Sequence, residues 1–430
     1  MPKELINKSL YPPFTLGPVE LKNRIVMAPM TRTRTSPGDI PNALMAKYYG
    51  QRAGAGLIIS EATDVAAHSK GYLWTPGIYT EEQVEGWRLV TKEVHRNNGR
   101  IFLQIWHVGR LAHTSLMPDG QAPWGVTDEK AGESDVFAHD ETGRLTFMRA
   151  SDPRSIRTDE IPGLIQDFRQ AFRNAKRAGF DGIEIHAANG YLFDQFMNSV
   201  LNTRTDAYGG RTVQSRTRFL LEVIDAATEE LGAGKIGVRL SPFGKYGSMP
   251  DDPQTEETLL YLSKEFNRRG VAYMHLLYQY LPAGNMQTSV FKEVNLPDDL
   301  VRQVREAFEG AIIWCGGFTR EAAMAAMETG WVDLIAFGRP FIANPDLVQR
   351  MKNNWPLAEA SRDAFYTRNG EKGYTDFPFL LPASDEWGAP TSPSLGAASV
   401  NPICDSLHLL SRKFCPASGG HLAERTVRAE

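Results

Sequence analysis

Short apolar runs alternate along this chain with longer segments in which apolar residues recur at helical spacing. In the run GIEIHAA, Ile183 and Ile185 alternate with polar residues, as in a strand whose two faces have different surroundings. We predict eight such strands, over residues 24–30, 56–62, 100–107, 182–188, 235–242, 272–278, 311–317 and 333–340. Helical patterns follow them, including IPGLIQDFRQAFRNAKRAG and TREAAMAAMETG.

This order of strands and helices predicts parallel βα units and therefore an α/β fold. Eight units favour a closed (β/α)8 TIM barrel. A doubly wound open sheet is the main alternative, but it usually carries a glycine fingerprint after its first strand. Here GAGLII, which begins at Gly54, precedes a strand and lacks the third glycine. We interpret it as a tight turn between a helix and a strand.

Two segments depart from the alternation. Residues 107–158, rich in Gly, Pro, Asp and Ser, are too long for a plain connection, so we predict a hairpin or lid insertion after the third strand. From about residue 382 the chain is dense in Pro, Ser, Ala and Gly without periodicity, which is typical of a poorly ordered tail. The expected division is a barrel over residues 1–380 and a low-complexity C-terminal tail over 381–430.

Composition narrows the function classes. With 47 basic and 51 acidic residues among 430, the net charge of −4 creates no long-range field that would attract nucleic acid or an anionic membrane. The start of the chain lacks the apolar core of a signal peptide, and no apolar stretch reaches the length of a membrane span. Three cysteines are too few for a disulfide framework. We expect a cytoplasmic monomer or homodimer with a small-molecule partner.

The residues that close the predicted strands are the first candidates for a site, because barrels of this type build their active sites there. Arg239 supplies a fixed positive charge, and Thr31 and Gln104 offer hydrogen bonds to a flat ring with carbonyls and ring nitrogens. The last two strands, where barrel phosphate sites commonly form, end in Gly316, Gly317, Gly338 and Arg339. Together these strand ends favour an aromatic cofactor that carries a phosphate.

Each of these features also has a structural interpretation. Single glycines at strand ends are more often turn residues than parts of a phosphate site. Arg239 could pair with a core carboxylate such as Glu184, and a lone histidine on a strand, such as His186, is usually structural. The agreement of seven strand ends favours a functional site.

Several longer motifs resemble the old yellow enzyme family of flavin-dependent ene-reductases. They are LKNRIVMAPMTR, GLIISEAT, GYLWTPGIYT, FLQIWHVGR, GFDGIEIHAANGYLFDQFMNSVLNTRTDAYGG, CGGF, FGRPFIANPDL and GYTDFP. The resemblance extends from about Tyr11 to Phe377. It implies FMN bound noncovalently at the barrel mouth, with NADPH or NADH as reductant. It also implies flavin contacts from Pro29, Thr31, Ala62, Gln104, Arg239, Gly316, Gly317, Gly338 and Arg339.

The same resemblance assigns roles in catalysis. His186 and Asn189 correspond to the pair that binds the substrate carbonyl, and Tyr191 corresponds to the proton donor. The aromatic pocket walls correspond to Tyr72, Trp106 and Tyr374. Many relatives read GYPNTPGIY where this chain reads GYLWTPGIY, so Trp74 bears on the shape of the pocket.

The expected reaction is the reduction of the activated C=C bond of an α,β-unsaturated carbonyl or nitro compound, in alternating hydride-transfer half-reactions. The alternatives are a barrel lyase or aldolase acting on a phosphorylated substrate, and a flavin or small-molecule binder without catalysis. A Schiff-base aldolase would need a lysine at a strand end, and these strand ends offer none. No metal is expected, because Cys404, His408, Cys415 and His421 match no common zinc spacing.

Overall fold

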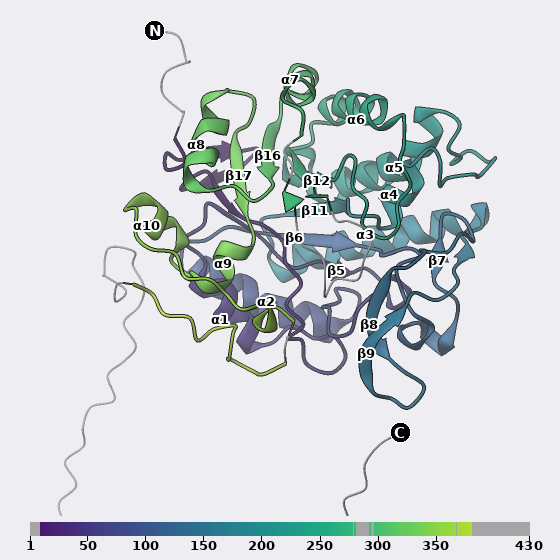
Figure 1. Ribbon diagram of the computed structural model, residues 1–430, viewed down its shortest axis with the longest axis horizontal. Coiled ribbons are helices and arrows are strands. Elements are labelled where there is room, and N and C mark those ends of the chain that lie inside the picture. The colour runs from purple at the N-terminus through teal and green to yellow at the C-terminus, as the bar shows by residue number, and fades with distance from the viewer. Residues whose placement is uncertain (1–8, 278, 281–291, 294–295, 367, 381–430) are drawn as a thin grey trace, which may run out of the picture. The chain divides into compact units, whose positions relative to one another are not determined.

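The computed structural model describes residues 9–277, 279–280, 292–293, 296–366 and 368–380. Within these residues, eight parallel strands pair in sequence order and the last pairs with the first, so the sheet closes into a barrel (Figure 1). The barrel strands are β3 (Ile25–Met27), β4 (Leu57–Ile59), β6 (Ile101–Trp106), β11 (Gly182–Ala187), β12 (Ile236–Leu240), β13 (Tyr273–Leu277), β16 (Ala311–Cys315) and β17 (Leu334–Phe337). The predicted (β/α)8 TIM barrel is confirmed, and all eight strands lie where the pattern placed them. The predicted C-terminal tail, 381–430, lies outside the described residues.

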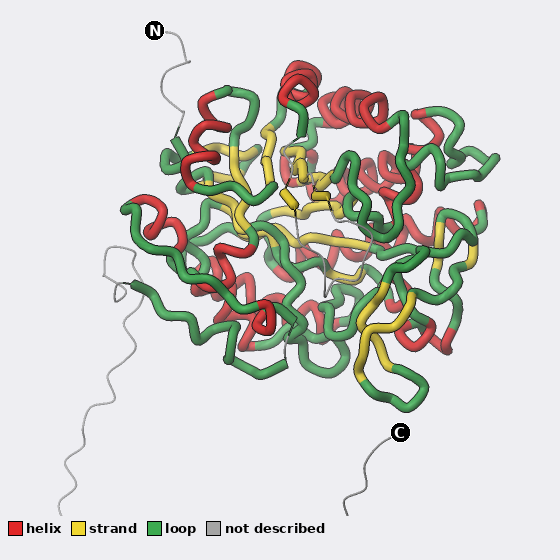
Figure 2. The backbone as a smooth tube through the Cα atoms, viewed as in Figure 1, coloured by secondary structure: helices red, strands yellow, loops and turns green. Residues whose placement is uncertain are grey.

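Helices surround the barrel (Figures 1 and 2). The cap of α2 explains its start, since the hydroxyl of Thr80 accepts from the N–H of Gln83 and the side chain of Gln83 accepts from the N–H of Thr80. The helices are α1 (Ala43–Gln51), α2 (Glu81–Arg96), α3 (Ile161–Ala178), α4 (Leu192–Met197), α5 (Val213–Leu231), α6 (Thr255–Arg269), α7 (Asp298–Ala307), α8 (Arg320–Glu328), α9 (Arg339–Ala343) and α10 (Leu347–Lys352). Short 3-10 helices are η2 (Ala67–Ser69), η3 (Thr114–Leu116), η4 (Pro118–Gly120), η5 (Thr158–Glu160), η6 (Ala233–Lys235) and η7 (Arg362–Ala364).

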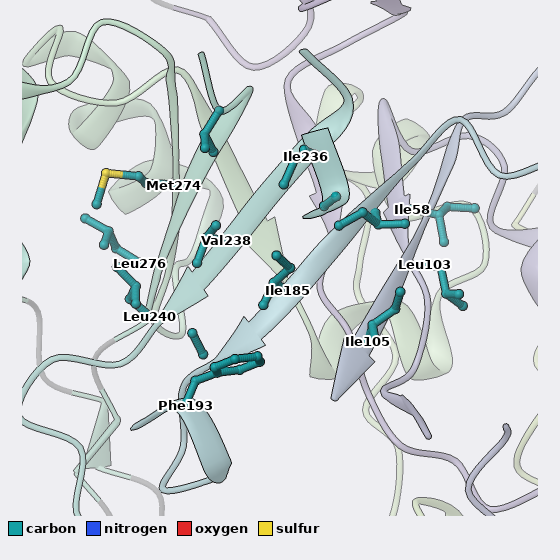
Figure 3. Packing of buried hydrophobic residues seen from close by; sticks show 14 of the residues in the cluster. Ile58, Leu103, Ile105, Ile185, Phe193, Ile236, Val238, Leu240, Met274 and Leu276 are labelled. Carbon is teal, nitrogen blue, oxygen red and sulfur yellow. The ribbon is translucent and has the colours of Figure 1, made fainter. Parts of the chain in front are cut away.

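The barrel strands are buried on both faces, and their alternation sorts the side chains into two layers. One layer packs between strands and helices and includes Leu103, Ile185 and the helix residue Phe193 (Figure 3). The residues between them on the strands, such as Gln104 and Glu184, face the barrel interior. The alternation therefore places polar residues inside the barrel.

A hairpin of β1 (Phe14–Leu16) and β2 (Val19–Leu21) packs against the interior residues of the strands. Leu16 and Leu21 belong to the same apolar cluster as Leu57, near the start of its strand. The turn needs Gly17, because its φ of 55° is left-handed and a Cβ there would lie 2.2 Å from the carbonyl oxygen of Gly234. This hairpin covers the N-terminal end of the barrel and leaves the site to the other end.

The insertion after the third barrel strand contains an antiparallel hairpin, β8 (Asp135–His139) and β9 (Leu145–Arg149), which extends from the barrel in Figure 1. Its inward residue Val136 packs in one apolar cluster with Tyr72, Trp106 and Tyr191. The predicted hairpin is confirmed, and it contacts the candidate site.

The remaining strands are β5 (Thr63–Asp64), β7 (Trp124–Gly125), β10 (Arg154–Ser155), β14 (Gln279–Tyr280) and β15 (Lys292–Glu293). In the described part of the chain, no helix is both long and apolar enough to cross a membrane.

Candidate active site

A layer of polar side chains lies inside the barrel just below its C-terminal end. The fully buried Glu184 accepts hydrogen bonds from Nε2 of Gln104 and from Nδ1 of His275, each at 2.8 Å. Burial acts to raise the pKa of Glu184, but His275, Arg239 and these hydrogen bonds outweigh it and lower the pKa. The interior therefore holds an ionised carboxylate. His275 lies in the middle of the sixth barrel strand, β13, and was not among the candidates that the sequence suggested.

Arg239 lies beside His186 on one neighbouring strand and beside His275 on the other. Its side chain is only 6% exposed, and its Nε is buried without a hydrogen-bond partner among the described residues. Among the described residues no ion pair joins Arg239 to Glu184, although the charge of Arg239 helps to lower the pKa of Glu184. A buried guanidinium N–H without a partner fits a site for an acceptor that comes from a ligand.

His186, the next-to-last residue of β11, lies among aromatic rings. Its ring is parallel to that of Trp106, with 6.1 Å between centroids, and meets the ring of Tyr191 edge to face at 5.1 Å. Burial, followed by the charges of Arg239 and His275, lowers the pKa of His186 well below its ordinary value. The imidazole is therefore neutral at physiological pH, and its buried Nδ1 has no partner among the described residues. Such a nitrogen can donate to a ligand oxygen.

Trp106 is held by a buried carboxylate. Its indole N–H donates to Oδ1 of Asp64 at 2.6 Å, and the other oxygen of Asp64 accepts from the hydroxyl of Thr75 at 2.8 Å. Asp64 is 1% exposed, and this burial raises its pKa to about 7. These bonds fix the plane of the indole against which His186 lies.

Asn189 takes a left-handed conformation, with φ of 57°, directly after β11. Its N–H donates to the hydroxyl of Ser241 at 2.6 Å, and the N–H of Gly190 donates to Asp194 at 2.8 Å. Burial raises the pKa of Asp194 to about 7. Left-handed backbone is disfavoured for residues other than glycine, so these two bonds stabilise the turn that carries Asn189 and Tyr191. Neither Ser241 nor Asp194 was predicted as part of the site.

Most of the residues predicted to bind the cofactor follow the C-terminal ends of barrel strands, whereas Gln104 and Arg239 lie within β6 and β12. Pro29 and Thr31 follow β3, Ala62 follows β4, and Gly316 and Gly317 follow β16. Gly338 precedes α9, whose first residue is Arg339. The atoms nearest to a Cβ on Gly338 would belong to Met30 and Ala28, at 3.5 Å or more, so local packing does not require glycine there. Space next to backbone at a strand end suits the approach of a phosphate.

Tyr374 does not lie with the aromatic residues around His186. It is fully buried and stacks on Tyr48, with 4.0 Å between ring centroids, below the guanidinium groups of Arg32 and Arg34. The structure thus gives the predicted role of Tyr374 as a pocket wall no support.

Trp74 lies next to the hairpin. Like Asn189, it has φ in the left-handed region, and its ring packs against that of Phe137 in β8.

Two other tyrosines, which the sequence interpretation missed, do lie with this group. The hydroxyl of Tyr246 is 2.6 Å from that of Tyr72. Tyr366 is close enough to affect the pKa of Tyr72, Tyr191 and Tyr246, and the pKa of each is raised, mainly by burial. Both tyrosines lie in loops without periodicity, so only their aromatic character could have drawn attention to them.

The fold and this site define a class of protein, a barrel enzyme with a cofactor at the C-terminal end of its strands. Comparison with known proteins then gives the family. The model of the NADH:flavin oxidoreductase / NADH oxidase family matches residues 9–358. The chain is 43% identical over 380 residues to 12-oxophytodienoate reductase 1 of Oryza sativa subsp. japonica. The aligned region covers 88% of this chain and 94% of that protein.

Solved structures agree. Morphinone reductase in complex with tetrahydroNAD has 44% sequence identity and a TM-score of 0.81, and the match covers 87% of this chain and 98% of that one. The old yellow enzyme homologue from Zymomonas mobilis has 37% identity and a TM-score of 0.78, over 86% of this chain and 100% of that one. This chain belongs to the NADH:flavin oxidoreductase / NADH oxidase family, to which the old yellow enzymes are related.

Family membership confirms the predicted class. The protein is an FMN-dependent oxidoreductase that takes its electrons from a nicotinamide and reduces the activated C=C bond of enones. The old yellow enzyme resemblance is confirmed as well.

The Cys and His residues of the tail lie outside the described residues. Within the described residues, no three His, Cys, Asp or Glu side chains are grouped to hold a metal ion.

Proposed function

We propose that this protein reduces cyclic enones, with His186 and Asn189 binding the carbonyl oxygen and Tyr191 protonating the α-carbon. The observation that carries this assignment is the buried Nδ1 of His186, which has no partner among the described residues, on a ring that contacts the rings of both Trp106 and Tyr191. A neutral donor held in this way is preorganised for the negative charge that develops on the carbonyl oxygen.

We further propose which residues hold FMN. Arg239 would donate to the isoalloxazine, because its buried Nε requires an acceptor. Gln104 would contribute through its carbonyl oxygen and its second amide N–H, since the first already donates to Glu184. The phosphate would lie at the ends of β16 and β17. The remaining contacts would come from the strand-end residues Pro29, Thr31, Ala62, Gly316, Gly317, Gly338 and Arg339.

When bound, FMN supplies the hydride for the β-carbon of the substrate. The protein residues do the rest. His186 and Asn189 orient the carbonyl and stabilise charge on its oxygen, and Tyr191 delivers a proton to the α-carbon as a general acid. The nicotinamide would use the same open end of the barrel, so that the two substrates alternate.

The proposed substrate class follows from the walls and from the relatives. We propose that Tyr72 and Trp106, whose ring centroids are 5.9 Å apart, form two aromatic walls, and that Tyr366 takes the position first expected for Tyr374. Aromatic walls favour a flat, apolar ring. Two relatives are named as reductases of oxo compounds, 12-oxophytodienoate and morphinone. A cyclic enone with an apolar body satisfies both observations.

An absorbance spectrum and a simple assay test this proposal. Purified protein should show the bands of bound flavin, and it should consume NADPH or NADH faster with 2-cyclohexenone present than without it. A flavin-loaded protein that no enone oxidises would refute the proposed substrate class.

We also propose a cytoplasmic location and a monomer or homodimer without a nucleic-acid partner, on the basis of the cysteine content and the net charge of −4. Cell fractionation and sedimentation would check these points.

A further inference from the structure

Three tyrosine hydroxyl groups form a chain across the candidate site. The hydroxyl of Tyr191 is 3.3 Å from that of Tyr72, which in turn is 2.6 Å from that of Tyr246. Tyr191 and Tyr72 are 7% and 6% exposed, whereas Tyr246 is partly buried. The chain therefore runs from two buried residues to one that is less buried.

The three tyrosines come from separate parts of the fold. Tyr191 precedes α4, Tyr72 lies in the loop after η2, and Tyr246 lies in the loop after β12. Tyr191 also meets the ring of Tyr246 edge to face, at 6.0 Å between centroids. The chain is thus built by tertiary packing.

A phenol in this setting is a poor isolated acid. Burial raises the pKa of Tyr191 well above its ordinary value, and the other groups with the largest effect on it are tyrosines, which are uncharged at neutral pH. If Tyr191 gave up its proton alone, it would leave a phenolate in a buried, aromatic environment, and such a charge is costly. A second proton that arrives as the first one leaves removes this cost.

We propose that Tyr72 and Tyr246 form a proton relay that restores the proton of Tyr191 during enone reduction. The inference rests on the function proposed above. As the O–H bond of Tyr191 breaks and a C–H bond forms at the α-carbon, the hydroxyl proton of Tyr72 passes to the oxygen of Tyr191. The proton of Tyr246 passes to Tyr72, and a solvent acid at the barrel mouth replaces it. The net change is one proton from solvent to carbon.

The geometry allows the chain to run in this direction. The 2.6 Å contact between Tyr72 and Tyr246 is a short hydrogen bond in which either oxygen can donate. The 3.3 Å contact between Tyr191 and Tyr72 is longer, as catalytic hydrogen bonds often are before substrate binds. When the hydroxyl of Tyr191 turns to substrate, its oxygen can accept from Tyr72. Each hydroxyl then donates once and accepts once.

The test is Tyr246→Phe, which keeps the ring beside Tyr191 and removes only the outermost hydroxyl. The rate of flavin reoxidation by 2-cyclohexenone is measured by stopped flow in mixtures of H2O and D2O. For the wild type we expect a curved dependence of rate on deuterium fraction, because more than one proton moves. The variant should be roughly tenfold slower, a smaller loss than the roughly 100-fold or more expected from removing the acid itself, with a straight-line dependence.

Three further variants separate a relay from a structural role. Tyr72→Phe breaks the row of hydroxyl groups one step closer to Tyr191. The double variant Tyr72→Phe/Tyr246→Phe should therefore be no slower than Tyr72→Phe alone, whereas independent packing losses would add. Tyr208→Phe is the matched control, since the hydroxyl of Tyr208 donates to Glu222 at 2.9 Å and belongs to no part of the site. Its rate and curvature should equal those of the wild type.

The outcomes distinguish the two proposals. A straight line for the wild type, a curved line that persists in Tyr246→Phe, or additive losses in the double variant would overturn the relay. If Tyr246→Phe fails to fold, Tyr72→Phe gives the same test. A Tyr191→Phe variant that is reoxidised by enone at the wild-type rate would instead overturn the acid role of Tyr191, and with it the proposed function.

Discussion

Replacement of Asp64 by asparagine should change how the stability of the protein depends on pH. Burial raises the pKa of Asp64 from 3.8 to about 7, so the folded protein holds a proton that the unfolded chain releases. Because the folded pKa is the higher one, this contribution to stability is fully present below about pH 4 and is lost as pH rises to about 7. A rise of this size corresponds to a loss of ~4 kcal/mol in the free energy of unfolding.

Asparagine has the shape of the aspartate side chain but cannot ionise. Its carbonyl oxygen can accept the indole N–H of Trp106, which in the wild type donates to Oδ1 of Asp64 at 2.6 Å. Its amide group can donate to the hydroxyl of Thr75, which also reaches the carbonyl oxygen of Tyr72. Asp64→Asn should therefore gain stability relative to the wild type as pH rises. Between about pH 5 and about pH 7.5 the difference should grow by about 2–3 kcal/mol.

The assay is denaturant unfolding of the flavin-loaded proteins at a series of pH values. Taking the difference between variant and wild type at each pH cancels every titration that the two proteins share. Asp159→Asn is the control, because its side chain is 76% exposed and pairs only with an exposed arginine. A constant difference between Asp64→Asn and the wild type across this range would refute the burial argument for Asp64.

Three other changes have defined outcomes. His186→Ala removes one donor from the substrate oxygen and should weaken binding of a phenol-type ligand by roughly 2- to 13-fold, measured by flavin difference spectra; unchanged binding would remove His186 from the site. Arg239→Ala should weaken FMN binding by roughly 10- to 150-fold, measured by flavin loss on dialysis, because a charged hydrogen bond is lost; full flavin retention would make Arg239 structural. Removal of residues 381–430 should leave a flavin-loaded, active protein, since their composition cannot form a packed core; flavin loss on truncation would contradict this.

The barrel could be predicted from sequence because each strand repeats one local pattern. Ile183 and Ile185 pack outward while Glu184 and His186 face inward, and a period of two residues is visible without any knowledge of tertiary contacts. The strand ends then place His186 and Arg239 at one end of the barrel, because parallel strands share their direction.

The walls and supports of the site could not be predicted in the same way. Tyr366 and Tyr374 are eight residues apart in a segment without periodicity, and only the path of the loop decides which one lies with Tyr191. Asp64 and Asp194 are carboxylates, which are usually exposed, so nothing in their neighbours indicates that burial raises their pKa. Side chains fixed by long-range packing need the structure.

The most direct test of the proposed mechanism separates the two half-reactions of Tyr191→Phe. Stopped-flow traces at the flavin band, recorded without oxygen, follow first the reduction by NADPH and then the reoxidation by 2-cyclohexenone. Flavin reduction should proceed at nearly the wild-type rate, because hydride transfer from the nicotinamide needs no acid from Tyr191. Reoxidation by the enone should slow by roughly 100- to 10,000-fold, the usual range for loss of a general acid. Reoxidation at the wild-type rate would contradict the account and remove Tyr191 from the reaction.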